Sequence, residues 1–271
     1  MPRTAKPLVA LVAVGALLTG CGGSSGANSP SGTSGSSGSS SATSSTAVAG
    51  TINVFAAASL QKAFTTLGSQ FERKNPGTKV VFNFGPSSGL AEQISQGAPA
   101  DVFASASTKT MDQVVTSGDA ASPTDFVTNT MEIAVPPDNP AGITSVADLA
   151  KKGVKVALCQ TDVPCGATAL TVFQNAKVHV TPVTEEIDVK ATLGKVSLGE
   201  VDAGVVYVTD VRAAGTSVKG IEIPSDVNAS TTYPIATLTS SKNKATAKAF
   251  VDYVLSPDGL AALTASGFSK P

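Results

Sequence analysis

The stretch Ile52-Asn53-Val54-Phe55-Ala56-Ala57-Ala58-Ser59-Leu60 decides the fold, because a strand-like segment runs directly into a helix-like one. Residues 52–58 form a short apolar run, which suits a strand buried on both faces of a parallel sheet. After Ser59, apolar residues recur at helical spacing, at Leu60, Ala63, Phe64, Leu67 and Phe71. Asn75-Pro76-Gly77 then ends the predicted helix.

The same alternation of strand and helix continues to the C-terminus. Further strands are predicted at 79–84, 101–105, 126–135, 155–158, 178–182, 203–208, 220–223 and 232–238. Further helices are predicted around Leu90 and Ile94, around Met111, and at 167–175, 189–198, 209–214, 245–255 and 257–265. This pattern predicts an α/β fold with parallel sheets. About 220 residues follow Gly50, so we expect two lobes with a cleft between them rather than one large sheet.

The composition excludes several classes of protein. Lys and Arg number 19 against 20 Asp and Glu, and the net charge of -1 leaves no basic surface of the kind that nucleic acid requires. One His and three Cys are too few for a zinc site of the usual type. We therefore expect no nucleic-acid partner, and a ligand that is not attracted by a bulk positive field.

The N-terminus has the features of a secretion signal. Arg3 and Lys6 precede the apolar run Leu8–Leu18, which would rise only about 16 Å as a helix and is too short to cross a bilayer. The run ends in Leu18-Thr19-Gly20-Cys21, which resembles a bacterial lipobox. The resemblance implies a signal peptide at 1–20 and a lipid on the Cys21 thiol. The alternative is a chance cysteine after an ordinary signal peptide.

A linker is predicted to follow the lipidated cysteine over residues 21–50. From residue 22 the segment contains Gly, Ser, Ala, Thr, Asn and Pro with a single Val, and it carries no charge. Such a segment cannot offset its ordering entropy by burial, so we expect it to be disordered. A lipid at one end and a folded domain at the other predict an extracytoplasmic protein anchored to the cell membrane, in a compartment that permits disulfides.

Four positions with small or hydroxyl side chains fall where a predicted helix begins. They are Ser59, Ser87, Val163-Pro164-Cys165-Gly166 and Asp188-Val189. A helix N-terminus presents unpaired N–H groups and a positive partial charge, so several together can bind an anion without a formal cation. For either serine, two interpretations stay open: a ligand of the anion, or an N-cap that satisfies its own helix.

Five motifs spread over the chain carry a resemblance to a known family. They are Val54-Phe55-Ala56-Ala57-Ala58-Ser59-Leu60, Gln93-Ile94 with Gly97-Ala98-Pro99-Ala100-Asp101-Val102-Phe103, Val163-Pro164-Cys165-Gly166, Gly204-Val205-Val206-Tyr207-Val208-Thr209-Asp210, and Tyr233-Pro234-Ile235. Together they resemble the molybdate-binding proteins of bacterial ABC importers, over essentially all of residues 51–271. The resemblance implies a two-lobed α/β fold, the periplasmic-binding-protein fold of type II, in which each lobe is a mostly parallel sheet flanked by helices. The implied boundaries are 51–131 and 236–271 for lobe 1, 132–235 for lobe 2, and crossover strands near 128–135 and 232–238.

The resemblance also implies a set of ligand-binding groups. Hydroxyl donors fall at Ser59 and Ser87, backbone N–H donors at Cys165 and Val189, and a phenol donor at Tyr207. The family commonly has Ala at the position of Cys165, a difference that matters little for a backbone contact. Molybdate is a dianion whose oxygens only accept hydrogen bonds, so a site made of donors suits it.

The implied role is that of a monomeric, lipid-anchored substrate-binding protein that delivers molybdate to an ABC permease, with no cofactor and no enzymatic activity. Tungstate is expected to bind equally well, and cavity size is expected to discriminate against sulfate. The runner-up ligand is another tetrahedral oxyanion, tungstate or sulfate.

One alternative from a different class is a serine hydrolase. Gly85-Pro86-Ser87-Ser88-Gly89, expected to be a turn, matches the G-x-S-x-G pattern of nucleophile elbows. A nucleophilic Ser87 would need a base, and the single histidine, His179, lies in the predicted strand 178–182. A lone His in such a strand is more often structural.

Cys159 and Cys165 remain after Cys21 takes the lipid. They lie six residues apart, beside the implied site in a secreted chain, which favours a disulfide between them. The competing interpretation is a pair of free, buried thiols. The spacing differs from C-x-x-C, so no redox role is expected.

Overall fold

The described part of the chain is residues 48–271 of the computed structural model. The predicted signal peptide 1–20, the lipidation site Cys21 and nearly all of the predicted linker 21–50 lie outside it. Where the description overlaps the linker, Gly50 already begins a strand. Across residues 48–271, no helix combines the length and the apolar character that a membrane crossing requires.

The first half of the described chain consists of strand–helix units, as the periodicity predicts. Its elements are β1 (Gly50–Ala57), the 3-10 helix η1 (Ala58–Leu60), α1 (Gln61–Lys74), β2 (Thr78–Gly85), α2 (Ser87–Ser95), β3 (Val102–Ala104) and α3 (Thr108–Thr116). β1 pairs in parallel with β2 on one side and with β3 on the other. The buried face of α1, with Phe64, Leu67 and Phe71, packs in the same apolar core as β1. Because the strands are parallel, the helices that follow them begin at one edge of the sheet.

The second half repeats this construction. Its elements are η2 (Val146–Ala150), β5 (Val156–Cys159), α4 (Pro164–Ala176), β6 (Thr184–Glu186), α5 (Val189–Ser197), β7 (Ala203–Tyr207), α6 (Val208–Ala214), η3 (Gly215–Ser217) and β8 (Lys219–Glu222). β5 pairs in parallel with both β6 and β7, and every residue of β5 and β7 is buried. Helices α4, α5 and α6 therefore also begin at the carboxyl ends of parallel strands.

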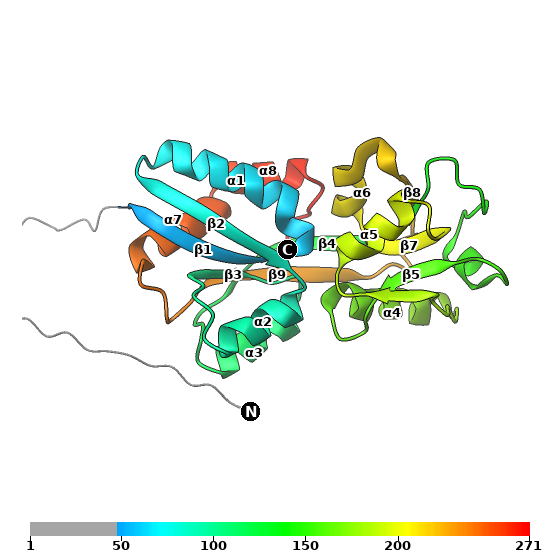
Figure 1. The fold of residues 1–271 in the computed structure, drawn as a ribbon, viewed down its shortest axis with the longest axis horizontal. Coiled ribbons are helices and arrows are strands. Elements are labelled where there is room, and N and C mark those ends of the chain that lie inside the picture. The colour runs from blue at the N-terminus through cyan, green and yellow to red at the C-terminus, as the bar shows by residue number, and fades with distance from the viewer. Residues whose placement is uncertain (1–47) are drawn as a thin grey trace, which may run out of the picture. The chain divides into compact units, whose positions relative to one another are not determined.

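Two long strands connect the halves, β4 (Thr124–Val135) and β9 (Ser230–Thr237) (Figure 1). They pair with each other in antiparallel fashion; β9 also pairs with β3 in the first half, and β4 with β7 in the second. The sheet is therefore continuous, in the order β2-β1-β3-β9-β4-β7-β5-β6, with β8 beside β4. Helices α7 (Lys244–Leu255) and α8 (Pro257–Ala265) return the chain to the first half, where they contact α1.

The apolar core follows this division into two lobes. One cluster draws on β5, α4, α5 and β7, and a second combines β1 and α1 with α7 and β9. A third, smaller cluster lies beneath α2 and α3. The architecture is thus the predicted two-lobed α/β fold, while the residue boundaries of the lobes stay a prediction.

Three details differ from the sequence prediction. Residues 178–182 form no strand, because the chain leaves α4 through Lys177 in the left-handed conformation and Pro182 offers no N–H to a sheet; the strand forms only at β6. The segment 85–89 is not a turn, since Ser87 begins α2 and the Leu90 N–H reaches the Pro86 carbonyl at 3.0 Å. The prediction of parallel sheets omitted the antiparallel pairing of the connecting strands.

A carboxylate closes the η2 turn that leads into β5. The Asp148 Oδ2 atom accepts hydrogen bonds from the N–H and hydroxyl groups of Thr144 and Ser145 at 2.8–3.1 Å, and Lys151 lies 2.6 Å from Oδ1. The Lys151 ammonium, followed by the Thr144 and Ser145 donors, holds the pKa of Asp148 well below its ordinary value of 3.8.

Asp148→Asn is expected to lower the free energy of unfolding by about 1–3 kcal/mol at pH 7, because several charge-assisted hydrogen bonds weaken. A carboxyl group whose pKa is lower in the folded state stabilises the fold at pH values above its unfolded-state pKa. This contribution is lost as the pH falls from there through the folded-state pKa. The difference between wild type and variant should therefore shrink below about pH 4 in urea denaturation. Asp112→Asn, at an exposed position on α3, is the control. A difference independent of pH would contradict this account.

Candidate functional site

Four helical N-termini and the end of one strand surround a single buried cavity. Its volume is about 20 Å³. The lining residues are Ala57, Ala58, Ser59, Gly85, Pro86, Ser87, Ala106, Val163, Pro164, Cys165, Asp188, Val189 and Tyr207. All five residues of the predicted ligand set line this cavity, and each of them is buried.

The size of the cavity limits what it can hold. A volume of about 20 Å³ is little more than one water molecule needs. Such a space suits a small inorganic ion better than a larger organic metabolite.

The two serines come from the first lobe, and neither acts as an N-cap. Ser59 lies inside η1, and Ser87 is the first residue of α2 rather than its cap; neither junction has a side-chain capping bond. The Ser59 Oγ atom lies 2.8 Å from the Tyr233 Oη atom, and Ser87 Oγ accepts the Ala106 N–H at 3.0 Å. The N-cap interpretation was therefore wrong for both, and the Ser87 proton remains available for a ligand.

Two backbone donors come from the second lobe. Pro164 opens α4 without an N–H, so the first N–H of that helix belongs to Cys165. Val189 opens α5, and the Asp188 Oδ1 atom accepts the next two N–H groups, from Lys190 at 2.8 Å and Ala191 at 2.9 Å. Capping by Asp188 thus occupies the neighbouring donors and leaves the Val189 N–H without an intrahelical partner.

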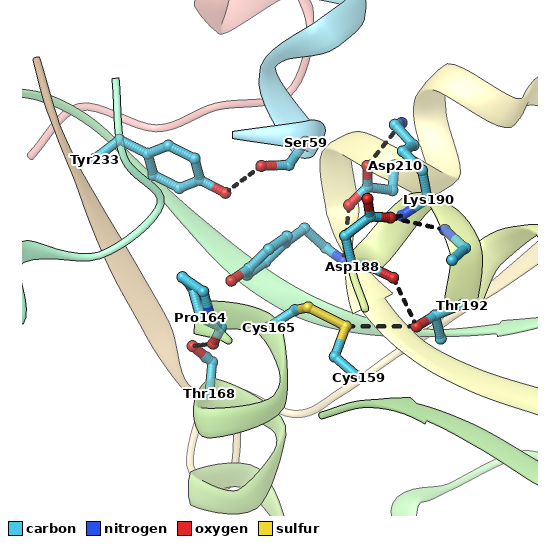
Figure 2. Close-up of a disulfide and its surroundings, with 12 residues drawn as sticks. Ser59, Cys159, Pro164, Cys165, Thr168, Asp188, Lys190, Thr192, Asp210 and Tyr233 are labelled. Atoms are coloured by element: carbon cyan, nitrogen blue, oxygen red, sulfur yellow. Dashed lines mark hydrogen bonds and ion pairs between the residues drawn. A yellow bond between two sulfur atoms is a disulfide. The ribbon is translucent and has the colours of Figure 1, made fainter. Parts of the chain in front are cut away.

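A disulfide holds the first turn of α4 against the end of β5 (Figure 2). Cys159 and Cys165 are bonded, with S–S 2.02 Å and Cα–Cα 5.8 Å, whereas the sequence alone had left free thiols open. Gly166, the next residue, packs so closely that a Cβ there would overlap the backbone carbonyl of Gln160. The absence of a side chain at this position therefore keeps the Cys165 N–H beside the cavity.

Tyr207 ends β7 at the cavity wall. Its side chain is only 1% exposed, and its Oη atom has no hydrogen-bond partner among residues 48–271. Burial raises the pKa of this phenol well above 10, so it keeps its proton at physiological pH. An unpaired, buried O–H is costly unless a ligand accepts it.

A buried ion pair, which the sequence analysis did not identify, supports the second-lobe donors. The Lys190 Nζ atom on α5 lies 2.8 Å from Asp210 Oδ1 on α6, and the other Asp210 oxygen accepts the Tyr207 N–H at 3.2 Å. Burial raises the pKa of Asp210, and the Lys190 ammonium opposes the rise. The pair links the start of α5, where Val189 lies, to the end of β7, where Tyr207 lies. Its only sequence signal was an acidic residue three positions into a helix.

The structure gives the hydrolase interpretation no support. His179 is exposed, lies outside every strand and is not among the residues that line the cavity. The hydrogen bond that reaches Ser87 Oγ comes from a backbone N–H, which is a donor and no base. Over the described range, no group of three or more His, Cys, Asp or Glu residues is arranged to hold a metal ion.

Comparison with known proteins gives consistent results. A family model described as bacterial extracellular solute-binding protein matches residues 52–269. The molybdate-binding protein ModA of Mycobacterium tuberculosis is 46% identical over 224 residues, covering 82% of this chain and 86% of that protein. ModA of Escherichia coli is 33% identical over 239 residues, covering 81% and 89%.

A solved structure extends the comparison to the fold. The periplasmic molybdate-binding protein of Azotobacter vinelandii matches with a TM-score of 0.72 and 21% identity, covering 81% of this chain and 99% of that one. Identity at that level concerns the fold alone. It confirms the predicted periplasmic-binding-protein architecture.

Gly166→Ala is expected to lower the free energy of unfolding by about 1–3 kcal/mol, because the new methyl group meets backbone atoms that cannot rotate away. The matched control is Gly194→Ala in α5, where a Cβ meets no atom within 4 Å. That change should raise the same quantity by up to about 1 kcal/mol through helix propensity. Urea denaturation checks both, and an equal response of the two variants would contradict the close packing at Gly166.

Proposed function

The chain belongs to the bacterial extracellular solute-binding protein family, and from that membership we propose that it captures molybdate for import by an ABC permease. The observation that carries the proposal is the buried cavity with a donor set of hydroxyl, phenol and backbone N–H groups. Relatives that are named molybdate-binding proteins, at 46% and 33% identity over most of the chain, support the choice of ligand.

The chemistry of the cavity suits a fully deprotonated oxyanion. Ser59, Ser87 and Tyr207 offer O–H groups, and Cys165 and Val189 offer N–H groups at helix starts, where the helix dipole favours negative charge. Each charge-assisted hydrogen bond contributes about 1.5–3 kcal/mol, so five or more of them offset the ordering cost and support micromolar or tighter binding.

The charged side chains beside the cavity are engaged in contacts within the protein. Lys190 pairs with Asp210, and the one acidic residue in the lining, Asp188, caps α5. A ligand that must donate a proton, such as hydrogen phosphate, would find few free acceptors. Tungstate matches molybdate in charge and nearly in size, so we propose that it binds equally well, while the smaller sulfate would leave donors too far away.

The proposed cellular context follows from the N-terminal sequence. Cys21, in the lipobox-like segment, would carry the lipid, and residues 21–50 would tether the folded domain outside the cytoplasm. Membership of the extracellular solute-binding protein family supports a location outside the cytoplasm. The protein would act as a monomer that presents its loaded form to the permease.

Isothermal titration calorimetry on residues 48–271 tests the ligand. Molybdate and tungstate are expected to bind at one site with dissociation constants of micromolar or below, sulfate far more weakly, and phosphate weakest. The order follows from a proposed ligand set made of donors in a cavity of fixed size. Sulfate binding of comparable strength would exclude the proposed specificity, and absence of any oxyanion binding would exclude the function.

Tyr207→Phe should move binding and stability in opposite directions. Loss of the phenol donor is expected to weaken molybdate binding by about 1.5–3 kcal/mol, or roughly 10- to 150-fold. Without ligand, the variant should be as stable as wild type or more so, because it removes a buried hydroxyl that has no partner in the described structure. Calorimetry and thermal denaturation measure the two effects.

The control for Tyr207→Phe is Tyr253→Phe, which makes the same chemical change on α7. The Tyr253 hydroxyl donates to Gln70 at 2.8 Å and does not line the cavity. Unchanged molybdate affinity in Tyr207→Phe would remove the phenol from the proposed ligand set.

A further inference from the structure

A chain of buried side-chain hydrogen bonds crosses from the second lobe to Ser59. The Asn129 Nδ2 group on β4 donates to Thr209 Oγ1 at 2.8 Å and to Tyr233 Oη at 3.4 Å. The Tyr233 Oη atom on β9 lies 2.8 Å from Ser59 Oγ (Figure 2). The four side chains are at most 6% exposed, so water does not compete for these bonds. Each of the two connecting strands thus supplies one residue of a hydrogen-bonded chain that ends at Ser59, a proposed ligand residue.

The direction of donation along this chain follows from its partners. The Asn129 Oδ1 atom accepts the Thr130 N–H at 3.1 Å, which identifies Nδ2 as the atom facing Tyr233. An amide nitrogen only donates, so Tyr233 Oη accepts from Asn129. A phenol has one proton, and the shorter contact of Tyr233 Oη is the one to Ser59 Oγ, 2.8 Å against 3.4 Å to Asn129 Nδ2, so we assign that proton to Ser59. Burial raises the pKa of Tyr233 well above 10, which keeps the proton in place.

The direction matters because an oxyanion offers acceptors only. If Ser59 donated to Tyr233, the serine would present lone pairs to the cavity and repel the ligand oxygens. Because Ser59 accepts from Tyr233, its own O–H is free to be donated into the cavity. The Ser87 O–H is also free to be donated, because the Ser87 oxygen accepts the Ala106 N–H at 3.0 Å. Each serine therefore has a lone pair occupied by a protein donor.

We propose that Tyr233, held by Asn129, is a positioning residue that orients the Ser59 hydroxyl as a donor to the bound oxyanion and thereby excludes ligands that must donate a proton. The inference rests on the proposed function, because it assigns a role at the same site. Tyr233 itself is not among the residues that line the cavity, so it acts through Ser59 and makes no contact with the ligand.

A double-mutant cycle on molybdate affinity tests the inference by calorimetry, with Tyr233→Phe and Ser59→Ala alone and combined. Tyr233→Phe should weaken binding roughly tenfold in the wild-type background, because Ser59 is free to turn its proton away. In the Ser59→Ala background the same change should alter affinity less than twofold. An equal loss in both backgrounds would overturn the proposal, because it would show that Tyr233 acts through packing alone.

Ligand selectivity gives a readout that a purely structural defect would not change. In Tyr233→Phe the freed Ser59 oxygen can accept a proton from hydrogen phosphate, so the ratio of phosphate to molybdate dissociation constants should fall several-fold. A structural defect would weaken both ligands alike and leave the ratio unchanged, which would contradict the proposal. Tyr253→Phe, outside the cavity, is the matched control and should alter neither constant.

Asn129→Ala provides a second route to the same end and covers the case in which Tyr233→Phe does not fold. Removal of the amide donor allows Tyr233 to accept from Ser59, so molybdate binding should weaken in the wild-type background but not in Ser59→Ala. Equal weakening in both backgrounds would refute the inference. If the wild-type protein binds no molybdate, both the proposed function and the inference are refuted. If the wild type binds molybdate and Tyr233→Phe binds it with unchanged affinity, only the inference is refuted.

Discussion

A buried hydrogen-bond donor needs an acceptor, and the centre of this protein is organised around that requirement. Helix starts at η1, α2, α4 and α5 meet at one cavity, and first-turn N–H groups have no acceptor within their own helix. The Tyr207 hydroxyl adds a donor that has no partner in the described part of the chain. A small ion whose oxygens only accept would complete the hydrogen bonding that the fold itself leaves open.

The arrangement depends on how the two lobes are built. In each lobe the central strands are parallel, so the helices after them begin at the same edge of the sheet. The antiparallel pairing of β4 with β9 joins these edges within one continuous sheet. Local features then refine the donors: a disulfide and Gly166 hold α4 close, and the Lys190–Asp210 pair joins the starts of α5 and α6. The proposed specificity arises from these supports as much as from the donors.

The elements were largely predictable because periodicity reports burial directly. The apolar run at 52–58 and the helical spacing up to Phe71 gave β1 and α1 within one or two residues, and Pro257 marked the start of α8. The prediction was wrong at 178–182, where two valines flank His179, because a strand also requires an adjacent strand with unpaired groups. It was also wrong at 85–89, where Gly and Ser favour a turn but α2 already begins at Ser87, with the Leu90 N–H bonded to the Pro86 carbonyl.

The sequence by itself determined the alternation of strand and helix, the junctions at which donors fall and, through motif resemblance, five of the residues that line the cavity. Each of these depends on neighbours along the chain. Only the tertiary structure decided that neither serine is an N-cap, that Cys159 and Cys165 are bonded, and that Asn129 and Tyr233 approach Ser59. The contact between Ser59 and Tyr233 joins residues 174 positions apart, so sheet order and packing set it rather than local spacing.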